Sequence, residues 1–208
     1  MRIAVFGATG GLGSLLVKQA LAQGHTVTAF VRNPAAVTIR HERLALVQGD
    51  VRDPAQVAVA VAGQDAVITA LGTRPGAPTG TFYSDSTRTI VGAMRAAGVR
   101  RLVCVSSWVV RESRKRAGPI GNLVVPLFPG RLYADRERQE QIVRDSGLDW
   151  IIVRPARLVD RPARGIYRSG PRLSMRIVAG ISRADVAEFV LKQVRDDTYL
   201  RQAVSVSY

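Results

Sequence analysis

Short apolar segments alternate with longer amphipathic segments along most of the chain. The apolar segments are rich in Val and Ile, have the length of strands, and mostly lack the polar alternation of an open antiparallel sheet. They fall at 2–6, 25–31, 44–48, 65–71, 101–106 and 150–154. Strands that are apolar on both faces are typical of parallel sheets. The pattern therefore predicts an α/β fold with parallel strands at its centre.

Three of the intervening segments have the periodicity of helices, and a glycine stops each of them. They cover 12–23 before Gly24, 84–98 and 135–147. Strand, helix and strand in repeated order predict a doubly wound parallel sheet with helices on both faces, the Rossmann architecture. With 208 residues and neither a repeat nor a low-complexity linker, residues 1–208 are expected to form a single domain.

The C-terminal part of the chain departs from this alternation and is expected to form a small substrate-side region. Residues 165–173 carry a turn signal at 169–171 and predict a small hairpin. Ser182 and Asp185 resemble a capping box at the start of a helix, and 202–208 is the expected last strand. The long irregular segment 108–131 is predicted to be a lid or a binding loop.

The overall composition describes an ordinary soluble protein, and we expect a cytoplasmic one. Hydrophobic residues make up 47% of the chain, and no apolar run reaches the ~18 residues of a membrane helix. The first residues lack the pattern of a signal peptide. One cysteine, Cys104, excludes an internal disulfide and a zinc site built on cysteines.

A net charge of +14 raises the question of nucleic-acid binding. Arginines provide 27 of the 30 basic residues and are spread from Arg2 to Arg201. No recognition-helix motif, aromatic RNA-binding motif or zinc finger accompanies them, so no specific nucleic-acid binding and no membrane binding is expected. The charge favours either an Arg-rich solubilising surface or a cationic rim that collects anionic substrates.

The segment "GATGGLG" joins the first predicted strand to the first predicted helix. Gly7 allows a tight turn, Gly10 lets a diphosphate approach the backbone, and Gly13 lets the helix pack closely. The helix N-terminus adds free N–H groups and a partial positive charge. This context predicts a dinucleotide site with contacts from Gly7, Thr9, Gly10, Gly11, Leu12 and Gly13.

Arg32 stands where NAD-specific sites have an acidic residue, near the end of the second predicted strand. A guanidinium fits the 2′-phosphate of NADP and gains nothing comparable from a bare ribose hydroxyl. The sequence therefore predicts that NADPH is preferred over NADH.

Several stretches together resemble the atypical short-chain dehydrogenase/reductases with an NAD(P)H-binding, NmrA-like fold. They include "FGATGGLG", "VQGDVRDP", "GQDAVITALGTR", "SGLDWIIVRPARLVD" and "ISRADVAEFVL". The resemblance covers almost the whole chain and is greatest for the group of biliverdin reductase B, also called flavin reductase. It implies an NADPH-dependent reductase of flavins or related acceptors.

The resemblance also implies cofactor contacts at the carboxyl ends of successive strands. Asp50 and Val51 would lie beside the adenine, with the Asp50 carboxylate accepting from its amino group. The remaining expected contacts are Leu71, Gly72 and Thr73 at the ribose and diphosphate, and Ser106, Ser107 and Pro155 at the nicotinamide. The alternatives are that Asp50 caps the following helix and that Gly72 only turns the chain.

Two departures from the resembling family concern anion binding. Ala36 stands where that family has a further Arg for the 2′-phosphate, and Arg40 is a candidate substitute. Arg157 stands where the family has a His near the substrate. We predict that Arg74, Arg157 and Arg164 gather near the nicotinamide and bind an anionic or flavin-like acceptor.

None of the five tyrosines has Lys four positions later, so the Tyr-x-x-x-Lys pair of ordinary short-chain dehydrogenases is missing. Tyr133 with Arg136 is the nearest stand-in, and Arg does not exchange protons near neutrality. His25 and His41 lie in the cofactor-binding half, which argues against hydrolysis by a Ser-His-Asp triad and against a metal site.

Hydride transfer to a conjugated acceptor that takes its proton from solvent remains. Ser107 is the candidate catalytic residue, because its hydroxyl would orient the nicotinamide or the acceptor; a purely structural Ser is the alternative. The competing function is a non-catalytic NADP(H) sensor, which the missing Tyr-Lys pair favours.

Overall fold

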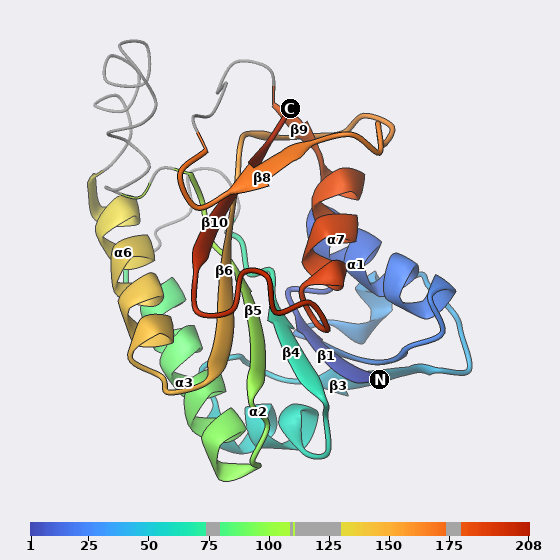
Figure 1. The fold of residues 1–208 in the computed structure, drawn as a ribbon. Coiled ribbons are helices and arrows are strands. Elements are labelled where there is room, and N and C mark those ends of the chain that lie inside the picture. Colours follow the sequence, from blue (N-terminus) through green and yellow to red (C-terminus); the bar gives the residue numbers. More distant parts are fainter. Residues whose placement is uncertain (74–79, 109, 111–129, 174–179) are drawn as a thin grey trace.

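The computed structural model describes residues 1–73, 80–108, 110, 130–173 and 180–208, and of 130–133 only the backbone. Its centre is an eight-stranded sheet (Figure 1). The strands of this sheet are β1 (Arg2–Phe6), β2 (Thr26–Val31), β3 (Leu44–Gln48), β4 (Ala66–Thr69), β5 (Arg101–Val105), β6 (Asp149–Pro155), β8 (Arg168–Gly170) and β10 (Ala203–Ser207). Their order is β3-β2-β1-β4-β5-β6-β10-β8, and every neighbouring pair is parallel except β10 with β8. The predicted α/β fold with a parallel sheet is confirmed.

Helices cover both faces of the sheet, as the alternation of segments predicted (Figure 1). One face packs against α1 (Gly11–Ala22) and α7 (Arg183–Lys192). The other packs against α2 (Pro54–Val61), α3 (Phe82–Ala96) and α6 (Gly130–Arg144). A short 3₁₀ helix, η1 (Pro34–Ala36), follows β2. Among the described helices, none is long and apolar enough to cross a membrane.

Strand β1 shows why the apolar segments lack polar alternation. Ile3 and Val5 belong to the core beneath α1 and α7, whereas Ala4 and Phe6 belong to the core on the opposite face. All four side chains are fully buried. Because successive side chains of a strand point to opposite faces, a strand between two helical layers needs apolar residues at every position.

The chain reverses its direction across the sheet between β1 and β4. It runs outward from β1 through β2 to β3, and then returns to β4 on the other side of β1. In open α/β sheets, ligands bind at such a reversal, outside the carboxyl ends of the strands. This edge is where the glycine-rich segment and the residues after β4, β5 and β6 come together.

One local prediction for the C-terminal part was wrong. The segment 165–173 forms no hairpin: β8 pairs antiparallel with β10, with Gly170 opposite Ser205. The strand that pairs with β8 comes from the far end of the chain and not from the other side of the turn. A second, two-stranded parallel sheet of β7 (Leu158–Val159) and β9 (Ile181–Ser182) was not predicted.

The helix start predicted at Ser182 is confirmed, because the Ser182 Oγ accepts from the Ala184 N–H at 3.1 Å. Asp185 does not complete a capping box. Its carboxylate accepts from the backbone N–H groups of Arg164 and Gly165 at 3.0 and 2.9 Å instead. Most of the segment 108–131, predicted to be a lid or binding loop, lies outside the described residues.

Candidate functional site

The glycine-rich segment between β1 and α1 is packed too tightly for side chains at two of its positions. Gly7 has φ +88°, and a Cβ there would lie 2.5 Å from the Ala70 carbonyl oxygen after β4. A Cβ on Gly13 would lie 2.0 Å from the Gly7 carbonyl oxygen. Both approaches are far below van der Waals contact, so the turn and the closely packed helix require glycine at these positions.

The N-terminus of α1 is open to solvent and carries no side-chain cap. Gly10 is the N-cap residue and has no side chain to accept from the first-turn N–H groups, and the first turn contains no acidic residue. Thr9, Gly10 and Gly11 are exposed. Uncapped N–H groups and the helix dipole make such a terminus suitable for a phosphate.

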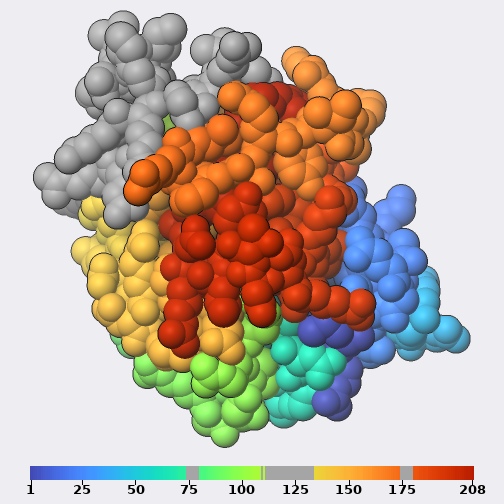
Figure 2. All heavy atoms as spheres, viewed as in Figure 1, coloured from blue at the N-terminus to red at the C-terminus, as the bar shows by residue number. Residues whose placement is uncertain are grey.

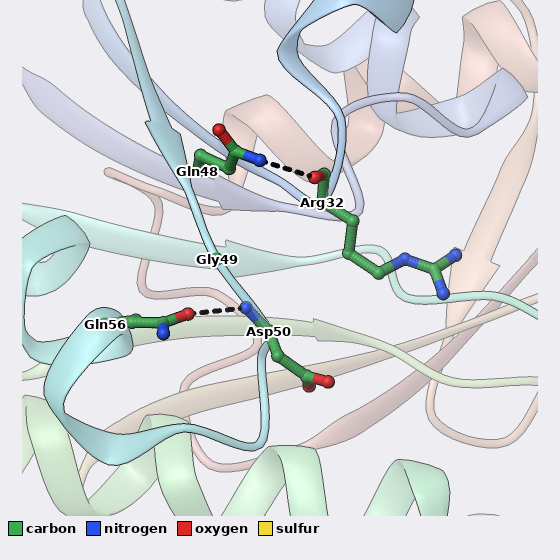
Figure 3. Close-up of a pocket in the computed structure, with 5 residues that line it drawn as sticks. All are labelled: Arg32, Gln48, Gly49, Asp50 and Gln56. Atoms are coloured by element: carbon green, nitrogen blue, oxygen red, sulfur yellow. Dashed lines mark hydrogen bonds between the residues drawn. The ribbon is translucent and has the colours of Figure 1, made fainter.

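Arg32 lines a pocket of about 570 Å³ beside the ends of β2 and β3, together with Gln48, Gly49, Asp50 and Gln56 (Figure 3). The Gln48 side chain donates to the Arg32 carbonyl oxygen at 3.3 Å, and the Asp50 N–H donates to Gln56 Oε1 at 2.8 Å. Within the described part of the chain, the Arg32 guanidinium has no hydrogen-bond or ion-pair partner, and the residue is exposed. The pocket therefore offers a free cation held on a fixed backbone.

Asp50 presents an ionised carboxylate to the same pocket. It accepts from the Arg52 side chain at 2.8 and 3.1 Å and from the Arg52 backbone N–H at 2.9 Å. These hydrogen bonds lower the pKa of Asp50 to about 2. The alternative that Asp50 caps the next helix is wrong: the cap of α2 is Asp53, whose Oδ1 accepts from the Ala55 N–H at 2.9 Å. Val51 is buried.

The three residues expected at the ribose and diphosphate follow β4 rather than belonging to it, because the strand ends at Thr69. The Thr73 Oγ1 lies 3.1 Å from the Tyr83 hydroxyl. The Leu71 carbonyl oxygen accepts from the Arg136 side chain at 3.1 Å. A Cβ on Gly72 would meet nothing within 4 Å, so no steric requirement supports the alternative that Gly72 is there to turn the chain.

Ser106, directly after β5, has a buried hydroxyl that lacks a hydrogen-bond partner in the described part of the chain. Its backbone N–H donates to the Val153 carbonyl oxygen at 2.8 Å, which fixes its position between β5 and β6. Buried hydroxyls without partners are uncommon, so this hydroxyl is available to a group beyond the described residues. Ser107 is half-buried beside it, and Pro155 is buried at the end of β6.

Arg136 is a site residue that sequence reasoning did not assign. It extends from α6 to the ends of two strands, where its guanidinium donates to the Leu71 carbonyl at 3.1 Å and to the Val105 carbonyl at 3.4 Å. The guanidinium carbon lies 3.4 Å from the centre of the Tyr83 ring. Burial lowers the pKa of Arg136. The only signal in the sequence was its spacing from Tyr133, whose side chain lies outside the described residues.

The other arginines considered for anion binding differ in their placement. Arg40 donates to the Val37 and Ile39 carbonyls at 2.7 and 3.2 Å, so its guanidinium is tied to its own loop. Arg164 lies over the Tyr208 ring at 4.2 Å, and Arg157 is exposed after β6. No contact joins these two among the described residues, and Arg74 lies outside them.

Comparison with known proteins agrees with this geometry. Residues 7–197 match the NAD(P)H-binding family. A (4-alkanoyl-5-oxo-2,5-dihydrofuran-3-yl)methyl phosphate reductase of Streptomyces griseus is 34% identical over 155 residues, which cover 74% of this chain and 46% of the reductase.

Two solved structures share the fold. An anaerobilin reductase, ChuY, from Escherichia coli has a TM-score of 0.82 and 23% identity, over 100% of this chain and 97% of ChuY. A short-chain dehydrogenase/reductase from Veillonella parvula in complex with NADP has a TM-score of 0.80 and 20% identity, over 100% of this chain and 94% of that one.

Proposed function

The chain belongs to the NAD(P)H-binding family, and from this membership we propose that it is an NADPH-dependent reductase of a flavin or a similar conjugated, anionic acceptor. The proposal includes the expected kinship with the biliverdin reductase B group. Relatives with reductase names support the reaction class. The observation that carries the proposal is the free Arg32 guanidinium in the pocket at the ends of β2 and β3.

The described residues fit a dinucleotide along the carboxyl edge of the sheet. The uncapped N-terminus of α1 suits the diphosphate, and Asp50 offers an acceptor for the adenine amino group. The Ser106 hydroxyl, which has no partner among the described residues, suits the carboxamide of the nicotinamide. Arg32 would bind the 2′-phosphate, which NADH lacks, and this is the basis for preferring NADPH.

When bound, NADPH supplies the hydride. The protein positions the nicotinamide against the acceptor and excludes water. Ser107 would orient the acceptor or the nicotinamide through its hydroxyl. Arg136, fixed by hydrogen bonds to the Leu71 and Val105 carbonyls, would provide a positive charge near this position. Such a charge would stabilise the anion that a flavin becomes before it takes a proton from solvent.

The acceptor is proposed to be anionic because, in the sequence, Arg74 and Arg157 come after predicted strands and Arg164 lies in the segment that follows Arg157. Arg157 and Arg164, with Arg74, would attract phosphate or carboxylate groups. FMN should then have a lower KM than riboflavin, and the gap should shrink as salt reduces the Debye length to ~8 Å or less. Equal KM values at low salt would refute the cationic rim and leave the reductase assignment intact.

The reductase proposal is tested by steady-state oxidation of NADPH with FMN, riboflavin and quinones. Turnover with one of these classes is the expected result. Tight NADPH binding without turnover of any acceptor would instead support the competing function, a non-catalytic NADP(H) sensor. The absence of a Tyr-x-x-x-Lys pair from the sequence is the observation that favours that competitor. The cytoplasmic location stays a prediction.

A further inference from the structure

Arg183 is brought to the glycine-rich segment by the packing of two helices. It is the first residue of α7, and α7 lies alongside α1 (Figures 1 and 2). The start of α7 is fixed from both sides. The Ser182 Oγ caps it, and the Tyr208 hydroxyl accepts from the Ser182 N–H at 3.2 Å. The backbone that carries Arg183 is therefore anchored.

The Arg183 side chain lies directly on the first turn of α1. A Cβ on Gly11 would be 3.0 Å from the Arg183 Nε and 3.1 Å from its Cδ. Gly11 is the residue that begins α1, next to the uncapped N–H groups described above. The guanidinium thus adds a full positive charge to a helix N-terminus that already favours anions.

The partner of Arg183 is a weak competitor for that charge. Its Nη1 lies 2.5 Å from an oxygen of Asp160, whose side chain is 85% exposed. The pairing follows from register, because Val159 of β7 is opposite Ser182 of β9 and the two charged residues come next. The contact is an ion pair only, and the buried Nη1 has no hydrogen-bond acceptor among the described residues.

We propose that Arg183 is a binding residue for the diphosphate of the dinucleotide, and that the diphosphate displaces Asp160 from it. The proposal rests on the proposed NADPH site and extends it to α7. A phosphate oxygen above Gly11 would accept hydrogen bonds from N–H groups of α1 and a charge-assisted hydrogen bond from the guanidinium. Among the described residues, the exposed Asp160 carboxylate has only the guanidinium contact, so the phosphate is favoured. In this arrangement Arg32 binds the 2′-phosphate, which only NADPH has, and Arg183 binds the diphosphate, which NADPH and NADH share.

The two roles separate in a binding experiment that follows nicotinamide fluorescence. Arg183→Met should weaken NADPH and NADH alike, by about tenfold, the loss of one charge-assisted hydrogen bond. Arg183→Lys should recover part of that loss. Asp160→Asn should tighten both dinucleotides, because it removes the competing carboxylate. Lys192→Met, which removes a charge from the far end of α7, is the matched control and should change neither.

Several outcomes would overturn the inference. The inference is wrong if Arg183→Met binds both dinucleotides with the affinity of the native protein. It is also wrong if only the affinity for NADPH falls. If Arg183→Met does not fold, as judged by circular dichroism, Asp160→Asn decides: unchanged or weaker binding of both dinucleotides contradicts the displacement. Failure of the native protein to bind either dinucleotide would instead refute the proposed function on which the inference rests.

Discussion

The sharpest test of the cofactor site is the replacement Arg32→Ala. In the described structure the Arg32 guanidinium has no partner to lose and is exposed, so the change should leave the unliganded protein almost unaffected. Its whole effect should fall on the complex with NADPH. A hydrogen bond to a charged group contributes about 1.5–3 kcal/mol, which is roughly a 10- to 150-fold change in Kd. We expect the lower end, because water screens an exposed pair.

The assay is a titration of NADPH and of NADH into native and Arg32→Ala protein. NADPH affinity should fall while NADH affinity stays nearly constant. Arg2→Ala is the matched control, because Arg2 is an exposed arginine that begins β1, at the opposite edge of the sheet from the pocket. Equal losses for both dinucleotides would show that Arg32 does not contact the 2′-phosphate, and the reasoning from the second strand would be wrong.

Four further predictions follow from buried or paired groups. Asp135, fully buried, accepts from the Tyr83 N–H at 2.7 Å and ties α6 to the start of α3, so Asp135→Ala should lower the free energy of unfolding by about 2–3 kcal/mol in urea; an unchanged midpoint would contradict this. Burial raises the pKa of Cys104 to about 11, so a thiol reagent at pH 8 should react only in denaturant. The pKa of Asp50 is lowered to about 2, so its share of stability is present above its unfolded pKa of about 3.9 and is lost as pH falls toward 2. Asp50→Asn should therefore flatten the acid unfolding curve below pH ~4, and a parallel curve would refute the assignment. Ser106→Ala removes a buried hydroxyl that has no partner in the described part of the chain, so it should weaken NADPH binding while leaving the free energy of unfolding in urea unchanged or slightly higher.

The parts of the fold that follow from neighbours in sequence could be predicted. The apolar run of β1 needs both faces buried, as Ile3 and Phe6 show, and this alone indicates a sheet between two helical layers. The spacing of Gly7 and Gly13 likewise indicates a tight turn into a closely packed helix, and the structure has both. These features depend on the periodicity of side chains and on the absence of a Cβ, which are local properties.

The parts of the fold and of the site that depend on contacts between distant segments could not be predicted. Strand β8 pairs with β10, so nothing within 165–173 specifies its partner. Arg136 reaches the site because α6 packs against α3 and β6, and its acceptors at the strand ends are backbone carbonyls, which leave no mark in the sequence. The placement of Arg183 also requires two helices more than 150 residues apart in the chain to pack together.

Part of the net charge of +14 is concentrated at one edge of the sheet. Arg32 follows β2, Arg136 reaches the ends of β4 and β5, and Arg183 lies on the first turn of α1, so cations from three distant segments face one edge of the sheet. The acid in the pocket, Asp50, is largely neutralised by Arg52. A solubilising surface alone needs no such placement, because its charges work equally well anywhere in solvent. A phosphate-rich cofactor does need it, since a dinucleotide presents its anionic groups to several strand ends at once.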